Sequence, residues 1–217
     1  MKKIIFVLVL MGIIFHFHKG ASFGSLFETA GAFNEDGSPK IQLYIQSNCG
    51  DPCDDALAHL RYKDIDAEIF DIDKDEGAIE NLRSLSTNRA LPALVVGSKV
   101  FHGFSSKTYN EYMYLAKGES VLGRTGKKVY REHFYEDGSP KVVMYAVSWC
   151  GYCKKATQYF NENGIDYVEW DVEDDWDAND RFRYLESSGY PLIYVGTLRV
   201  GTFDLVKIQE ALDAFDT

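Results

Sequence analysis

The sequence predicts an α/β protein made of two copies of one domain, each a mixed four-stranded sheet with helices on both faces. The first observation is a motif of eight residues that occurs at 33–40 and again at 134–141, with seven identities. The second is a pair of cysteines after each motif, Cys49/Cys53 and Cys150/Cys153. A two-copy repeat with a period of about 100 residues indicates a duplicated domain, because solenoid units have only about 20–50 residues.

Apolar patterns place the same elements in the same order in each copy. A strand at 41–45 or 142–147 leads to the cysteines, and a second strand is expected at 67–72 or 167–172. The segments 92–97 and 191–196 predict a third strand that runs into a tight turn, before a return strand and a last helix. Apolar residues at helical spacing predict a helix after each cysteine pair: Ala56, Leu57 and Leu60 in copy one, and Ala156, Tyr159 and Phe160 in copy two.

The repeat also sets the expected boundaries. Domain 1 is predicted at 33–117 and domain 2 at 132–217. Between them, residues 118–131 combine three glycines with basic residues that include Arg124, Lys127 and Lys128. This composition predicts a linker.

The start of the chain has the layout of a secretory signal peptide. Lys2 and Lys3 precede an apolar run at 4–17, and small residues follow at 20–22. We expect residues 1–22 to be cleaved and the protein to be secreted or periplasmic. The run is shorter than the about 20 residues that span a bilayer. An uncleaved membrane anchor is the alternative, and only in that case is a membrane an expected partner.

Composition and charge limit the function further. The chain is 46% hydrophobic and 26% charged, which is typical of a globular protein and not of a disordered one. Its formal net charge of −10 argues against a nucleic-acid partner, because a phosphate backbone requires a basic patch. In an oxidising compartment, cysteines that come as close pairs tend to form disulfides.

The pair Cys150/Cys153 lies where a predicted strand becomes a helix. A helix start offers unpaired N–H groups and partial positive charge, which stabilise a thiolate relative to a thiol. Lys154 and Lys155 add positive charge nearby. These features predict thiol–disulfide exchange, with attack by Cys150 and resolution by Cys153.

Three segments of copy two carry a family resemblance. Residues 148–153, Ser-Trp-Cys-Gly-Tyr-Cys, resemble the active-site turn of the glutaredoxin and thioredoxin superfamily. Residues 189–191 are similar to its cis-proline segment, and residues 201–205 to the glutaredoxin segment that begins the last helix. The resemblance implies two tandem thioredoxin-like domains of the glutaredoxin type. It also implies these substrate-binding residues: Trp149, Tyr152, Tyr190, Pro191, Phe203 and Asp204.

The resemblance further implies a thiol–disulfide oxidoreductase that acts on protein or glutathione disulfides. No bound cofactor and no metal are expected, and glutathione is the co-substrate that the family would use, with Asp204 on its amine. Two positions depart from the family pattern. Val147 stands where many glutaredoxins have a lysine, and Thr202 replaces the second glycine of a usual pair.

Copy one matches the pattern less well. Its cysteines are separated by three residues instead of two, and Asp51, Asp54 and Asp55 would oppose a thiolate. Ser105 replaces the counterpart of Asp204. Cys49/Cys53 is therefore either a second redox pair or a structural disulfide. For the whole chain, the alternative to an enzyme is a non-catalytic thioredoxin-fold binding module with structural disulfides.

The histidines show no metal-ligand spacing. His59, His102 and His133 are expected at the surface or in hairpins. Zinc would need both cysteine pairs, which lie in separate folded copies.

Overall fold

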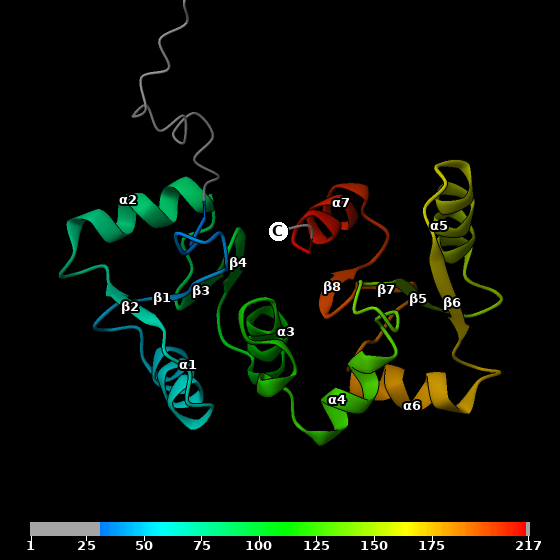
Figure 1. Cartoon of the computed structure of the whole chain (residues 1–217), viewed down its shortest axis with the longest axis horizontal. Helices are drawn as coiled ribbons and strands as arrows, with labels where there is room; N and C mark the ends of the chain where they lie inside the picture. Colours follow the sequence, from blue (N-terminus) through cyan, green and yellow to red (C-terminus); the bar gives the residue numbers. More distant parts are fainter. Residues whose placement is uncertain (1–30, 216–217) are drawn as a thin grey trace, which may run out of the picture.

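The computed structural model describes residues 31–215 of the chain, and the predicted signal peptide at 1–22 lies outside these residues. In copy one, β1 runs parallel to β2 and antiparallel to β3, which pairs with β4, so the strand order is β2-β1-β3-β4 (Figure 1). The elements of copy one are β1 Ile41–Ile45, α1 Asp51–Tyr62, β2 Glu68–Asp71, α2 Glu76–Leu85, β3 Ala93–Val96, β4 Lys99–His102 and α3 Ser106–Lys117.

Copy two repeats this topology with the strand order β6-β5-β7-β8. Its elements are β5 Val142–Ala146, α5 Gly151–Glu162, β6 Tyr167–Asp171, α6 Trp176–Tyr184, β7 Leu192–Val195, β8 Leu198–Gly201 and α7 Leu205–Asp213. The predicted fold, two mixed four-stranded sheets with helices on both faces, is confirmed. Between residues 31 and 215, no helix is long and apolar enough to cross a bilayer.

Alternation along the strands explains the layers. In β1, Leu43 belongs to the large core that includes α1 and α3, whereas the neighbouring Tyr44 packs into a smaller core with Ala78 and Leu82 of α2. Successive strand residues point to opposite faces, so buried residues at successive positions require a helix on each side. The sheet is thereby covered on both faces.

The predicted linker at 118–131 is wrong as a description of this segment. It forms a short 3-10 helix, η1 Gly118–Val121, and an α-helix, α4 Arg124–Arg131. Val121, Val129 and Tyr130 are buried in the large core. The basic residues Arg124 and Lys128 lie on the exposed face of α4, whereas the apolar residues on its other face pack against both copies.

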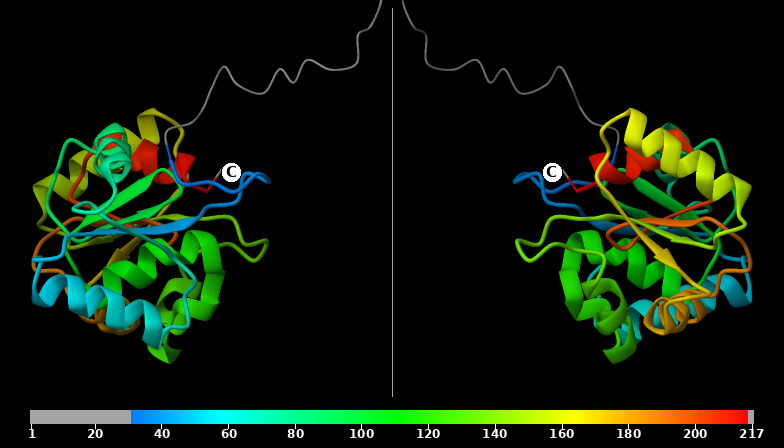
Figure 2. Two further views of the ribbon diagram at one scale, coloured as in Figure 1. Left: turned by 90° about the vertical axis from the view of Figure 1, so that its left-hand side faces the viewer. Right: turned by 90° about the vertical axis from the view of Figure 1, so that its right-hand side faces the viewer.

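The two copies form one body with a shared core. A single hydrophobic cluster contains Leu43 and Met113 of copy one as well as Val143 and Ile208 of copy two. Figures 1 and 2 show α1 and α3 on one side of the sheets and their counterparts α5 and α7 on the other. The copies are therefore related by a half-turn that exchanges the two faces.

The half-turn leaves the strand direction unchanged. In both views of Figure 2, the hairpin before β1 (blue) and the hairpin before β5 (lime green) protrude from the same end of the molecule. Since β1 and β5 each run from their hairpin to their cysteines, the two cysteine turns lie at the opposite end. We call this the cysteine end.

A buried polar cluster joins the copies. Glu111 of α3 accepts a hydrogen bond from the Tyr130 hydroxyl of α4 and another, at 3.1 Å, from the Tyr194 hydroxyl of β7. Its backbone carbonyl accepts from Thr197 Oγ1 at 3.0 Å, and Arg199 Nε donates to the Tyr194 hydroxyl at 3.0 Å. Glu111 is buried, and this burial raises the pKa of its carboxyl.

Of the two expected positions of His133, the surface is wrong and the hairpin is correct, since its carbonyl accepts from the Lys141 N–H at 2.9 Å at the base of the hairpin. The side chain is fully buried, with Nδ1 at 2.8 Å from the Gly196 carbonyl and Nε2 at 2.8 Å from the Tyr145 hydroxyl. It lies among the rings of Tyr130, Trp170 and Tyr194. Burial lowers the pKa of His133 to about 3, so the folded protein holds a neutral imidazole.

This burial predicts acid sensitivity that originates at His133. A pKa that is lower in the folded state than in the unfolded state contributes stability above the unfolded value, about 6.5, and that stability is lost as the pH falls toward 3. Between pH 7 and pH 5 the loss should be about 2 kcal/mol of unfolding free energy. Denaturant titrations at the two pH values measure it. In His133→Asn, the decrease in unfolding free energy between pH 7 and pH 5 should be smaller by about 2 kcal/mol. If the decrease is the same in this variant, His133 is not its source.

Candidate functional site

The Cys150–Cys153 disulfide stands at the start of α5, directly after β5. The two Cα atoms are 5.2 Å apart. Cys150 is the N-cap residue of α5, and its Sγ accepts a hydrogen bond from the Cys153 backbone N–H at 3.0 Å. Cys150 is 6% exposed and Cys153 2%. The first cysteine is thus the more accessible one, and its sulfur lies where a helix start favours a thiolate.

The Cys49–Cys53 disulfide has a different relation to its helix. Its Cα atoms are 5.7 Å apart. Because of the additional residue between the cysteines, Gly50 with a φ of 72° is the N-cap of α1, and no side chain caps the helix. Cys49 lies one residue before the cap and does not receive the hydrogen bond that Cys150 receives. The three-residue spacing therefore removes Cys49 from the helix start.

An exposed tryptophan borders the copy-two disulfide. Trp149 is 65% exposed, and its Nε1–H donates to both carboxylate oxygens of Glu173 at 3.1 Å. Its ring packs edge-on against Tyr190 at a centroid distance of 5.9 Å, and Tyr190 stacks on Phe182 at 4.9 Å. Glu173 was not among the predicted site residues, and its position directly after the acidic end of β6 was the only signal in the sequence.

Pro191 lies next to the cysteine turn. The Tyr190–Pro191 peptide bond is cis, and so is the equivalent Leu91–Pro92 bond of copy one. In the register of β5 with β7, Tyr145 faces Leu192, which places Pro191 beside the end of β5. Burial raises the pKa of the Tyr190 hydroxyl, and the nearby charges of Glu173 and Asp171 raise it further.

Two other predicted site residues have structural contacts of their own. Phe203 packs against Tyr159 of α5 at a centroid distance of 5.6 Å. Asp204 is the N-cap of α7, and its Oδ1 accepts from the backbone N–H groups of Val206 and Lys207 at 3.1 and 3.2 Å. Ser105 caps α3 in the same way. A helix cap is therefore the role that this position has in both copies.

Charge around the copy-two disulfide is mixed. Lys154 and Lys155 are exposed on α5, and the Lys155 ammonium lies 5.2 Å from the ring centroid of Tyr152, which is itself exposed. Val147, at the position where the resemblance would place a lysine, is buried. Within residues 31–215, no cluster of three or more His, Cys, Asp or Glu side chains could hold a metal ion.

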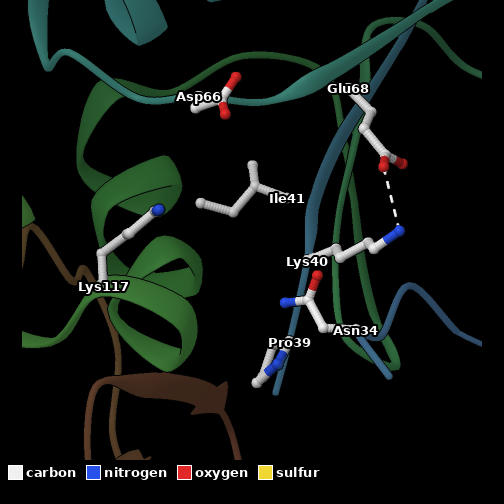
Figure 3. Close-up of a pocket in the computed structure, with 7 residues that line it drawn as sticks. All are labelled: Asn34, Pro39, Lys40, Ile41, Asp66, Glu68 and Lys117. Atoms are coloured by element: carbon white, nitrogen blue, oxygen red, sulfur yellow. Dashed lines mark hydrogen bonds and ion pairs between the residues drawn. The ribbon is translucent and has the colours of Figure 1, made fainter. Parts of the chain in front are cut away.

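One pocket lies away from both disulfides. It is at the opposite end of β1 from the cysteines, where Lys40 and Glu68 form an ion pair at 3.1 Å (Figure 3). Its lining residues are Asn34, Pro39, Lys40, Ile41, Asp66, Glu68 and Lys117. None of them carries sulfur, so this pocket takes no part in disulfide chemistry.

Each copy is a thioredoxin-like domain. It combines a mixed four-stranded sheet, a cis-proline before its third strand and a cysteine pair at its first helix. The glutaredoxin family model matches residues 41–101 and 142–200, more than half of the chain. The chain belongs to the glutaredoxin family, as the resemblance of copy two implied.

Two relatives are about as long as one copy of the repeat. The chain is 31% identical over 74 residues to an uncharacterized glutaredoxin-like 8.6 kDa protein in the rubredoxin operon of Clostridium pasteurianum, covering 33% of this chain and 97% of that protein. It is 32% identical over 78 residues to a glutaredoxin of Pseudomonas aeruginosa, covering 36% of this chain and 93% of that protein. This chain differs from both in carrying the domain twice.

Proposed function

We propose that this protein is a thiol–disulfide oxidoreductase that exchanges disulfides through Cys150 and Cys153 in an exported compartment. The observation that carries the proposal is the position of the Cys150 sulfur at the start of α5, where it accepts the Cys153 N–H. A thiolate formed there is stabilised by the helix dipole and by this hydrogen bond. Export follows from the predicted signal peptide at 1–22, with a membrane anchor as the alternative.

The exchange proceeds in two steps. The Cys150 thiolate attacks one sulfur of the substrate disulfide, forms a mixed disulfide and releases the other substrate sulfur as a thiolate. The Cys153 thiolate then attacks the Cys150 sulfur, forms the Cys150–Cys153 disulfide and releases the first substrate sulfur. Two electrons pass from the protein to the substrate. The reverse sequence oxidises a substrate dithiol.

The proposed substrates are protein disulfides or glutathione disulfides, and no bound cofactor is needed. Pro191 offers an edge of backbone beside the cysteines, and Trp149, Tyr152 and Tyr190 supply aromatic surface. Glutathione as a co-substrate would use Asp204 in addition to its capping role. For Cys49–Cys53, the loss of the cap position supports a structural disulfide.

Measurement of the two reduction potentials tests this assignment. We expect Cys150–Cys153 to equilibrate at between about −300 and −120 mV, the range of catalytic pairs, and Cys49–Cys53 to stay oxidised to below about −300 mV. Equilibration in thiol redox buffers, followed by alkylation and mass spectrometry, reports both pairs in the full chain. If both pairs lie below that limit, the protein is a binding module with structural disulfides. If only Cys49–Cys53 lies above it, copy one is the enzyme.

A further inference from the structure

We infer that Trp149 and Glu173 form a subsite for a positively charged side chain of the substrate, so that the preferred substrate is a disulfide in a polypeptide with lysine or arginine near the cysteine. This inference rests on the proposed function and makes it more specific. It concerns the cysteine end of copy two and the choice among disulfide substrates.

The Trp149 ring is fixed on two sides and open on another. Its N–H is held by Glu173, and its edge contact with Tyr190 restricts its orientation. Most of its surface nevertheless remains exposed. A cation within about 6 Å of an indole centroid is attracted by the negative face of the ring. A fixed and exposed indole beside a disulfide is therefore suited to bind an ammonium or guanidinium group.

Glu173 supplies the complementary charge at the edge of the same ring. Its side chain is exposed, and a carboxylate has about four acceptor positions, of which the indole N–H engages only some. A substrate cation lying on Trp149 would reach this carboxylate. Asp171 adds negative charge on the same side, since its Oδ1 accepts a hydrogen bond from the Glu173 backbone N–H at 2.8 Å. The electrostatic potential beside Pro191 is thus negative.

Two of the other charged side chains of copy two have contacts away from Trp149. Lys155 lies over Tyr152, a different ring from Trp149. Asp204 is engaged as a helix cap and lies 3.7 Å from the Lys207 ammonium. Glutathione carries two carboxylates and one ammonium, and the buried Val147 offers its carboxylates no cation. Near Glu173, such an anion would be repelled where a basic polypeptide would be attracted.

Copy one provides a matched control. Asn48 occupies the position of Trp149, so no indole is present there. Asp73 occupies the position of Glu173, and its carboxylate accepts from Gln46 Nε2 at 3.1 Å and from the Ser47 backbone N–H at 3.2 Å. Asp73→Asn removes one negative charge from the cysteine end without touching the proposed subsite.

The test compares two short peptides that carry a single cysteine as a mixed disulfide with 2-mercaptoethanol, one flanked by lysines and the other by glutamates. The neutral bis(2-hydroxyethyl) disulfide is the third substrate. With the full-length protein, kcat/KM for the lysine peptide should exceed that for the glutamate peptide by about tenfold at low salt. Glu173→Gln, which keeps an acceptor for the indole N–H, and Trp149→Ala should each lower this ratio about threefold. Asp73→Asn should preserve it.

Each result has a distinct meaning. Equal rates on the two peptides, together with reduction of the neutral disulfide, overturn the inference and leave the proposed function in place. A ratio that Asp73→Asn lowers as much as Glu173→Gln does would also overturn it, because the preference would then come from the overall charge of the cysteine end. If the protein reduces none of the three substrates, the proposed function is refuted, and the inference with it.

Discussion

We expect Cys150→Ser to lower the rate of disulfide exchange by the full-length protein about a thousandfold or more, because a serine hydroxyl does not ionise near neutral pH and cannot replace the attacking thiolate. Cys153 cannot substitute for it. Its sulfur is buried one helical turn inside α5, whereas Cys150 is at the cap and partly accessible. Turnover of a small neutral disulfide, coupled to a dithiol reductant, measures the effect.

Two other single variants complete this test. Cys49→Ser should retain the rate within about twofold, since Cys49 lies outside the cap of α1 and receives no hydrogen bond from the helix start. In a single turnover without added reductant, the reduced Cys153→Ser variant should stop at the mixed disulfide, which mass spectrometry of the intact protein detects as an added substrate mass. Loss of activity in Cys49→Ser with retention in Cys150→Ser would assign the chemistry to copy one.

The sequence predicts the fold of each copy well because the signals are local. The apolar strand around Leu43 and the apolar stripe at Ala56 and Leu60 need only nearby residues to be recognised. Because the chain contains the domain twice, each element is predicted from two separate segments. The disulfide partners follow from the close spacing of the cysteines, whereas the cis-proline was implied by the resemblance to the glutaredoxin family.

The parts that were not predicted depend on contacts between segments far apart in the chain. The helix α4 is buried because Val129 and Tyr130 meet both copies, which spacing within residues 118–131 does not reveal. His133 is enclosed by Gly196 of the β7–β8 turn and Tyr145 of β5. The contact between Trp149 and Glu173 likewise exists only because β5 and β6 pair in parallel and end together.

The interface between the copies determines how the molecule should unfold. A core shared by α3, α4 and β7 means that neither copy keeps its buried surface when the other is removed. Without α3, the second copy would leave the hydroxyls of Tyr130 and Tyr194 without their acceptor. The two domains should therefore unfold as one cooperative unit, although copy two alone carries the proposed active cysteines.

Glu111→Ala should lower the free energy of unfolding by about 3–5 kcal/mol, because two buried hydroxyls lose their acceptor at a cost of about 1–3 kcal/mol each. The carboxyl accepts from Tyr130 and Tyr194, and its removal leaves both hydroxyls without this buried acceptor. Glu111→Gln keeps the size and one oxygen, so it should cost about 1–2 kcal/mol. Denaturant titration of the full chain measures each value.

The control is another glutamate of the same region. Glu119 of η1 pairs with Arg131 at 3.4 Å, but the side chains are 43% and 69% exposed, and a solvent-accessible ion pair contributes about 0–1 kcal/mol. Glu119→Ala should therefore change the unfolding free energy far less than Glu111→Ala. If the two variants lower the free energy of unfolding equally, Glu111 stabilises only its own helix α3 and not the contact between the copies. A large effect confined to Glu111, within a single unfolding transition, would identify this carboxyl as the polar contact that joins the two domains.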